Sequence, residues 1–147
     1  MSGFRAARYA PAMATDEEGI RRTLAQYAQL CDEGRFEEWA DLFAADARFH
    51  VMGTTYDGRA AITGFISAAM PPEARGKHAI LASVIDVGNA VASAWTDYLF
   101  ATRKGQITSV GRYHDELERG DDGRWRFTLR EIVFIGGQPQ LAQPLPG

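Results

Sequence analysis

Apolar side chains recur every three or four positions between residues 16 and 33, which is the period of an amphipathic helix. Thr15 and Glu18 have the spacing of a capping box, which predicts where this helix begins, and Gly34 predicts where it ends. The apolar stripe consists of Ile20, Leu24, Tyr27, Ala28 and Cys31. We therefore expect a helix that packs one face against the rest of the protein.

A second amphipathic pattern follows Gly34 and predicts another helix that ends near Asp46. Its apolar side comprises Phe36, Trp39, Ala40 and Phe43. Residues 47–52 have the pattern of a short strand, and residues 56–58 that of a turn. A third helix is predicted next, and Pro71 and Pro72 end it. It carries Ile62, Phe65, Ile66 and Ala69.

The second half of the chain changes to the pattern of β-hairpins. Four segments rich in β-branched and aromatic residues, at about 77–87, 90–103, 106–119 and 124–135, are separated by glycine-containing turns. They predict an antiparallel meander, so the fold class is α+β with the helices on one face of a curved sheet. We expect one domain over residues 15–136, a flexible segment at 1–14 and an extended or disordered tail at 137–147.

Composition excludes several classes of partner. The 147 residues carry a net charge of -3 without a basic run, so no nucleic-acid partner is expected. No apolar stretch is long enough for a membrane span or a signal peptide, which predicts a cytoplasmic location. The single cysteine, Cys31, has no cysteine partner and lies on the apolar stripe, which favours a buried, inert thiol. Metal-ligand spacings and a phosphate-binding loop are absent from the sequence.

Asp32 is the first candidate for chemistry. It follows Ala28 by four residues, so it continues the apolar stripe at the point where the helix ends. This spacing points its carboxylate inward. The alternative is a solvated turn, in which aspartate is also favoured. The helix geometry alone leaves both interpretations open.

Four segments carry a resemblance to a known family. They are YAQLCDEGRFEEWADLFAADARF, YDGRAAITGF, KHAILASVIDVGNAVASAW and GRYHDELERGDDGRWRF, and they reach from about residue 16 to residue 135. In order and spacing they resemble the SnoaL-like branch of the nuclear transport factor two-like superfamily. The resemblance implies a cone-shaped, cystatin-like α+β barrel, in which three N-terminal helices close a curved antiparallel sheet around an apolar pocket. Its enzymes include scytalone dehydratase, hexachlorocyclohexane dehydrochlorinase, ketosteroid isomerase and polyketide cyclases, which move protons without a metal or an organic cofactor.

The resemblance also implies a set of catalytic residues. Asp32 and His78 match the aspartate and histidine on which the dehydratase and dehydrochlorinase members depend. A neutral imidazole can remove a proton at physiological pH, and a buried carboxylate holds its tautomer and stabilises the imidazolium. Tyr27 matches a tyrosine that donates a hydrogen bond to a developing oxyanion in the isomerases. Trp39, Tyr56 and Phe65 are expected to contact the substrate.

The strand around residues 111–118 allows an argument from alternation. Tyr113 and Asp115 share one face, while Arg112, His114, Glu116 and Glu118 share the other. We expect Tyr113 to act in catalysis and Asp115 to bind substrate, at the position where the isomerases keep a protonated acid. His114 is a reserve candidate, since a β-bulge would turn it inward. Asp97 is expected to pair with an arginine of a neighbouring strand.

These expectations favour a cofactor-independent lyase or isomerase that uses Asp32 and His78 on a small, apolar, cyclic or oxygenated substrate. Residues 49–53 lack the acid that serves as the base in steroid isomerases, which argues against that reaction. One alternative is a non-catalytic binding or assembly module. The superfamily includes such proteins, among them the β subunits of ring-hydroxylating dioxygenases, although these tend to be longer. Another alternative is a polyketide cyclase. Apolar residues on both faces of the strand at 90–103 predict a homodimer or homotrimer.

Overall fold

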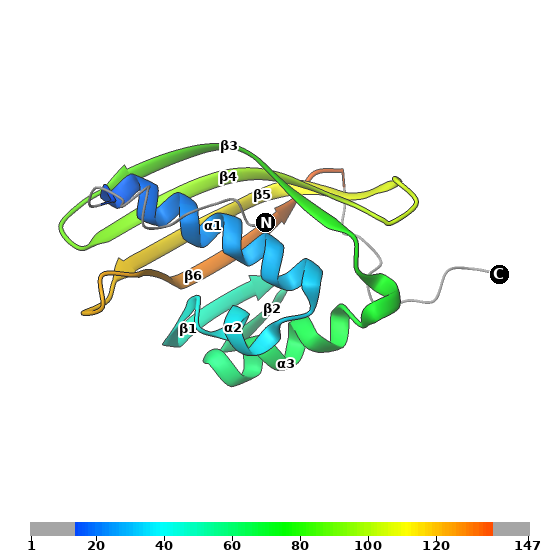
Figure 1. Ribbon diagram of the computed structural model, residues 1–147, viewed down its shortest axis with the longest axis horizontal. Coiled ribbons are helices and arrows are strands. Elements are labelled where there is room, and N and C mark those ends of the chain that lie inside the picture. Colours follow the sequence, from blue (N-terminus) through cyan, green and yellow to red (C-terminus); the bar gives the residue numbers. More distant parts are fainter. Residues whose placement is uncertain (1–13, 137–147) are drawn as a thin grey trace, which may run out of the picture.

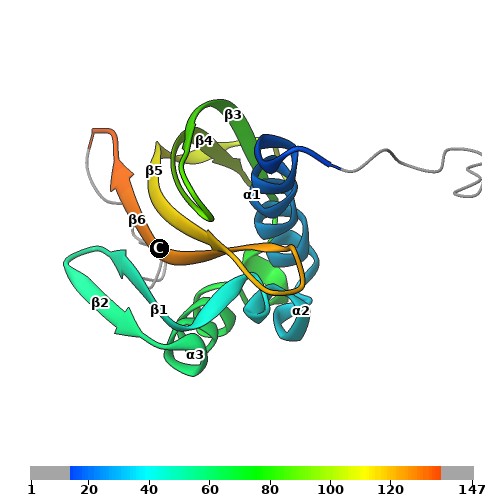
Figure 2. The ribbon, with the colours of Figure 1, turned by 90° about the vertical axis from the view of Figure 1, so that its left-hand side faces the viewer.

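The computed structural model describes residues 14–136 and confirms the α+β fold class. Six strands form one curved sheet in the order β2-β1-β6-β5-β4-β3, and α1 crosses its concave side (Figures 1 and 2). The sheet does not close on itself, because β2 and β3 are its two edges. The predicted segment 1–14, apart from Ala14, and the predicted tail 137–147 lie outside the described residues.

Helix α1 spans Asp16–Glu33, as the apolar stripe predicted. Thr15 and Glu18 form the reciprocal capping box, with Oε1 of Glu18 accepting from the Thr15 amide at 2.7 Å. Gly34 ends the helix with a φ of 72°, a left-handed conformation that glycine adopts without a steric penalty.

The second helix is shorter than predicted. Helix α2 spans only Phe36–Ala40, and strand β1 covers Phe43–Val51, so the expectation of a helix to Asp46 is wrong. Strand β1 begins where Phe43 pairs with Phe127 of β6 in parallel orientation. Trp39 and Phe43 are four residues apart, a spacing that fits a helix. Pairing with β6 nevertheless places Phe43 in a strand, where its side chain is fully buried.

A hairpin that the sequence analysis missed follows β1. Strand β2 spans Thr54–Asp57 and pairs antiparallel with β1 through the two-residue turn Met52-Gly53, in which both residues have positive φ. The strand has only four residues, and three of them are exposed, so it carries almost no apolar signal. Helix α3 spans Arg59–Ala69, as predicted, and a short 3-10 turn at Pro72–Ala74 leads to the next strand.

The four long strands lie where the sequence predicted them. They are β3 (Lys77–Val87), β4 (Val91–Ala101), β5 (Ile107–Arg119) and β6 (Trp125–Phe134), and consecutive strands pair antiparallel. The sheet as a whole is mixed rather than purely antiparallel, because β1 runs parallel to β6. No helix among residues 14–136 is long and apolar enough to cross a membrane.

The two faces of the sheet differ in burial. Aromatic residues of the helices and of β1, β5 and β6 fill the concave side, where the Tyr27 ring lies 5.3 Å from Trp39 and 6.0 Å from Phe127. The convex side leaves large apolar side chains exposed. Those that are exposed are Leu81, Val84, Val91, Trp95, Ile107, Val110, Val133 and Ile135, the last just beyond β6.

Candidate active site

A small apolar cavity lies between the sheet and the helices. Its volume is about 100 Å³, and most of its lining is aliphatic or aromatic. The lining residues are Tyr27, Phe49, Val51, Phe65, Ile66, Ala69, Met70, Ala74, His78, Tyr98, Phe100, Ser109, Tyr113, Ile132 and Phe134. The polar groups in this wall are one imidazole, three phenols and one hydroxyl. An apolar pocket with a few convergent polar groups is the usual form of a small-molecule site.

Asp32 and His78 meet at the wall of this cavity. Oδ1 of Asp32 lies 2.7 Å from Nδ1 of His78, and both carboxylate oxygens also accept from the His78 backbone amide at 3.1 and 3.2 Å. Their side chains are only 4% and 12% exposed, so Asp32 points inward and is not a solvated turn residue. Because a carboxylate can only accept, Nδ1 carries a hydrogen, and in the neutral ring Nε2 therefore keeps its lone pair.

The end of α1 and the edge of the sheet hold this pair together. Strand β3 is an edge strand, so backbone amides on its outer side have no neighbouring strand to bond. The carboxylate of Asp32 takes the place of a strand for one such amide, that of His78. The histidine is thus fixed through both its backbone and its ring.

The phenols of Tyr27 and Tyr113 face the same cavity from α1 and β5. Their ring centroids are 5.5 Å apart, and the Tyr27 ring lies 6.4 Å from the His78 ring. Burial raises the pKa of Tyr27, and Arg130 opposes this rise; burial also raises the pKa of Tyr113. Both phenols are therefore protonated at neutral pH and can donate hydrogen bonds.

Two further polar residues of the wall were missed by sequence reasoning. The Tyr98 ring stacks on Tyr113 at 4.3 Å, and its hydroxyl lies 2.8 Å from Oγ of Ser109. Gly111 makes room for this ring, since a Cβ there would lie 2.9 Å from a Tyr98 ring carbon. The sequence did carry a signal for Tyr98. It lies two positions from Thr96 and from Phe100, so it shares their face of β4, and it pairs with Gly111 of β5.

Asp115 faces inward, as alternation predicted, but it does not line the cavity. It accepts two hydrogen bonds of 2.7 Å from Nε and Nη2 of Arg130, and both side chains are fully buried. The expected substrate-binding role, by analogy with a protonated acid, is therefore wrong. Burial raises the pKa of Asp115, but the carboxyl oxygens both serve as acceptors for a guanidinium.

Alternation along β6 would have placed Arg130 on the outer face. Trp125 and Phe127 point inward, and the register between β5 and β6 then slips by one residue, because Glu116 pairs with Leu129 while Leu117 pairs with Phe127. This bulge at Thr128 turns Arg130 inward. The sequence carried no clear signal for it.

Three other expected contacts are corrected by the structure. His114 points to the convex face, where it stacks on Trp95 at 4.2 Å, because β5 has no bulge near it. Trp39 is buried beneath Tyr27 and does not line the cavity. Tyr56 stacks on Phe65 at 4.6 Å, and only Phe65 reaches the cavity wall. Asp97 pairs with Arg112 of β5 at 2.6 Å, as expected.

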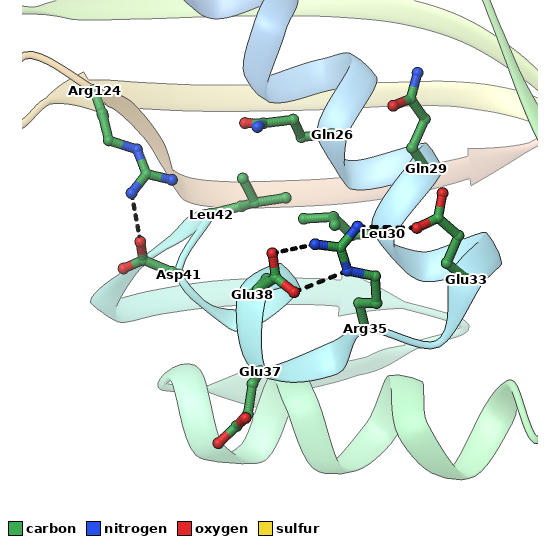
Figure 3. Close-up of a pocket in the computed structure, with 10 residues that line it drawn as sticks. All are labelled: Gln26, Gln29, Leu30, Glu33, Arg35, Glu37, Glu38, Asp41, Leu42 and Arg124. Carbon is green, nitrogen blue, oxygen red and sulfur yellow. Dashed lines mark hydrogen bonds and ion pairs between the residues drawn. The ribbon is translucent and has the colours of Figure 1, made fainter. Parts of the chain in front are cut away.

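A larger opening lies elsewhere and is less suited to chemistry. Figure 3 shows this groove, which lies beside α1 and α2. Its volume is about 520 Å³, and none of its lining residues lines the apolar cavity. Most of its charged side chains pair with one another, as in Arg35 with Glu38 at 2.6 Å and Arg124 with Asp41 at 2.7 Å. These pairs are about half exposed, which is typical of a solvated surface.

Two other kinds of chemistry find no support in the described part of the chain. Among residues 14–136, no group of three or more histidine, cysteine, aspartate or glutamate side chains is arranged to hold a metal ion. Cys31 is buried, and burial raises the pKa of its thiol to about 12, so it is not a thiolate nucleophile at neutral pH.

Comparison with known proteins agrees with this architecture. The sequence model of a family described as SnoaL-like domain matches residues 12–131. The chain belongs to the SnoaL-like domain family. None of the curated proteins matches the chain.

Solved structures share the fold of this SnoaL-like chain. An NTF2-like protein with a cystatin-like fold from Novosphingobium aromaticivorans is 26% identical, with a TM-score of 0.73 over 87% of this chain and 89% of that one. A candidate scytalone dehydratase from the same organism is 24% identical, with a TM-score of 0.72 over 82% and 84%. The β subunit of a candidate aromatic-ring-hydroxylating dioxygenase, also from that organism, is 22% identical, with a TM-score of 0.69 over 96% and 100%. The last match spans nearly the whole of both chains.

Proposed function

We propose that this SnoaL-like protein is a cofactor-independent lyase or isomerase, in which His78 removes a proton from carbon and Asp32 orients it. The observation that carries the proposal is the 2.7 Å contact between Oδ1 of Asp32 and Nδ1 of His78 at the wall of an apolar cavity. The contact fixes the tautomer in which Nε2 is the basic nitrogen, and Nε2 makes none of the hydrogen bonds found among residues 14–136.

The proposed elimination uses two kinds of group. Nε2 of His78 takes a proton from a carbon beside a carbonyl, and the electron pair of that C–H bond forms a double bond. The bond to a β-hydroxyl breaks, and the imidazolium returns the proton to the departing oxygen, so the products are an unsaturated ketone and water. Tyr27 or Tyr113 donates a hydrogen bond to the carbonyl oxygen as negative charge develops on it. In an isomerisation no C–O bond breaks, and the imidazolium returns the proton to another carbon.

The cavity limits the size of the substrate. A volume of about 100 Å³ is smaller than the roughly 150 Å³ apolar cavity that holds benzene in an engineered protein. Because the cavity is partly open to solvent, we propose a ligand with one small, oxygenated ring that enters it from one side and keeps part of its surface outside. The cavity wall contains no carboxylate, because Asp32 lies behind His78, which disfavours a cyclase that gives the leading role to an acid.

The proposal is tested with two single-ring probes. Cyclohexanone in deuterated buffer reports proton removal through loss of its α-proton signal in NMR, and 3-hydroxycyclohexanone reports elimination through the absorbance of the enone. The wild-type protein should accelerate at least one reaction, and His78→Ala should lower that rate by about 10²-fold or more. His50→Ala is the matched control, since His50 bonds Thr55 outside the cavity and its removal should leave the rate unchanged.

The second candidate function is a ligand-binding or assembly module, which the likeness to a dioxygenase β subunit over nearly the whole of both chains favours. It predicts that the probes bind without reacting and that His78→Ala binds them equally well. Equal rates in wild-type protein and His78→Ala would refute the proposed chemistry. Saturation-transfer NMR on both probes separates absence of binding from absence of reaction.

We also propose that the convex face of the sheet packs against another copy of the chain. Val84, Trp95, His114 and Glu131 form one cross-strand row there, and Val84 and Trp95 are 68% and 51% exposed. Exposed apolar patches of this kind mark interaction surfaces. Light scattering after size-exclusion chromatography should give a dimer or trimer, and Val84→Glu should give a smaller species. A monomer in the wild type would refute this proposal.

A further inference from the structure

A fully buried ion pair lies behind the cavity wall. Arg130 of β6 and Asp115 of β5 are cross-strand partners, joined by two parallel hydrogen bonds of 2.7 Å, and neither side chain is exposed. Removing two charges from water is costly, and apolar residues can often replace a buried ion pair without loss of stability. Stability alone is therefore a weak explanation for this pair.

The guanidinium lies directly on the aromatic residues that form the cavity wall. Its Cζ is 3.7 Å from the ring centroid of Tyr113, 4.1 Å from that of Tyr27 and 4.3 Å from that of Phe127. Tyr27 and Tyr113 line the cavity, whereas Arg130 does not. The cation is thus separated from any ligand by the two phenol rings that would contact it.

Asp115 compensates only one side of this cation. Nε and Nη2 bond the carboxylate, but Nη1 is buried and has no hydrogen-bond partner among residues 14–136. A buried, unpaired donor is unfavourable, and a native structure retains one only where something offsets the cost. The guanidinium is thus not fully satisfied by Asp115, and its charge lies against the rings of Tyr27 and Tyr113.

We propose that Arg130 is a positioning residue that acts through Tyr27 and Tyr113, making them stronger hydrogen-bond donors to a ligand oxygen that gains negative charge. A phenol that donates such a bond shifts negative charge onto its own oxygen, and an adjacent cation favours that shift. The inference deepens the proposed function and rests on it, because it names the ligand group as a carbonyl or departing oxygen held by these phenols.

The direction of the effect follows from the surroundings of the phenols. Burial raises the pKa of Tyr27 and Tyr113, which weakens them as donors, and the charge of Arg130 works in the opposite direction for both. Burial also works against the charge of Arg130 itself, but attraction to Asp115 outweighs it and raises the pKa of the guanidinium. Arg130 is therefore a cation at neutral pH and well above it.

The experiment removes the cation without leaving Asp115 unpaired. The variant combines Asp115→Leu with Arg130→Met, and 3-fluorotyrosine, a phenol that ionises at lower pH than tyrosine, is placed at position 27 or 113. Titration followed by fluorine NMR gives the midpoint of ionisation without any substrate. We expect the midpoint at both positions to rise by about one pH unit, because the cation that favours the phenolate is gone.

The matched control combines Asp97→Leu with Arg112→Met. That pair also joins neighbouring strands, with a 2.6 Å bond, but it lies exposed on the convex face. The control should leave both midpoints unchanged. If the apolar variant does not fold, Asp115→Asn with Arg130→Gln removes the same charges with polar side chains of similar shape and should give the same rise.

Two outcomes decide the inference. A rise in both neutral variants, with a midpoint near that of wild type in Arg130→Lys, supports it, since lysine restores the charge. An unchanged or lower midpoint in a folded neutral variant overturns it. The titration needs no turnover, so an unreactive wild-type protein would refute the proposed function while the titration still decides the effect of Arg130.

Discussion

Replacing Asp32 by asparagine is the sharpest test of how the candidate site is built. The carboxylate accepts from two donors, the ring Nδ1–H of His78 at 2.7 Å and its backbone amide at 3.1 and 3.2 Å. An asparagine has one acceptor oxygen and one donor group in the same volume. It can satisfy one donor of His78 but places an N–H group against the other.

The size of the effect follows from the bonds that are lost. A hydrogen bond to a charged group contributes about 1.5–3 kcal/mol, and the Asp32 side chain is only 4% exposed, so solvent replaces little of it. We expect Asp32→Asn to lower the free energy of unfolding by about 2–3 kcal/mol, and Asp32→Ala by about 3–5 kcal/mol, because alanine leaves both donors unpaired. Urea denaturation followed by circular dichroism measures both values.

The tautomer of His78 gives a second, independent measurement. In the wild type the neutral ring should carry its hydrogen on Nδ1, whereas an asparagine amide that donates to Nδ1 moves the hydrogen to Nε2. Nitrogen-15 NMR of the histidine ring distinguishes the two forms. The loss of the basic Nε2 lone pair should remove most turnover as well.

Asp16→Asn is the control for this prediction. Asp16 lies at the opposite end of the same helix and makes a half-exposed ion pair of 2.8 Å with Arg119. Its replacement should cost less than about 1 kcal/mol. If Asp32→Asn costs no more than this control and leaves the His78 tautomer unchanged, the carboxylate does not hold the base, and the proposed mechanism fails.

Further predictions concern stability. Burial raises the pKa of the Cys31 thiol from an ordinary value of 9.0 to about 12 in the folded protein. The stability that this neutral thiol contributes to the fold is therefore fully present below pH 9 and is lost as the pH rises toward 12. Between about pH 8 and about pH 10.5, urea melts should show the wild type losing about 2 kcal/mol more than Cys31→Ala, and equal losses would contradict the burial of the thiol. Gly111→Ala should cost about 1–3 kcal/mol, because its Cβ would clash with the Val133 carbonyl oxygen and lie 2.9 Å from Tyr98. Gly64→Ala, where nothing lies within 4 Å, should instead stabilise α3 by about 0.5–1 kcal/mol, and thermal melts that rank the two alanine variants the other way would refute this.

Elements with a long, regular pattern could be predicted from the sequence, and short ones could not. The stripe from Ile20 to Cys31 and the four β-branched segments extend over ten or more residues, so local preference and tertiary packing agree there. Strand β1 failed because Phe43 fits a helical period and a strand equally well, and only its pairing with Phe127 decides between them. That partner lies 84 positions further along the sequence.

The candidate site divides in the same way. Tyr113 could be placed because it lies on an unbroken strand, where alternation fixes the direction of the side chain. For Asp32 the helical spacing leaves an inward carboxylate and a solvated turn both open, and only the family resemblance favours the inward one. Arg130 could not be placed, because the single extra residue at Thr128 reverses the alternation of β6. The sequence allows a bulge that would turn His114 of β5 inward, but the bulge in the structure lies at Thr128 of β6 and turns Arg130 inward.

The two halves of the site depend on different parts of the fold. His78 lies on edge strand β3, where the carboxylate of Asp32 serves both as a substitute for a missing strand and as the partner of the ring. The phenols and Arg130 lie in the packed interior of α1, β5 and β6, where a change at one ring reaches the others. A single aspartate can thus position the proposed base locally, whereas the strength of the proposed donors depends on the whole core. Substitutions at Asp32 should therefore separate base chemistry from donor strength, which substitutions at Tyr27 cannot do.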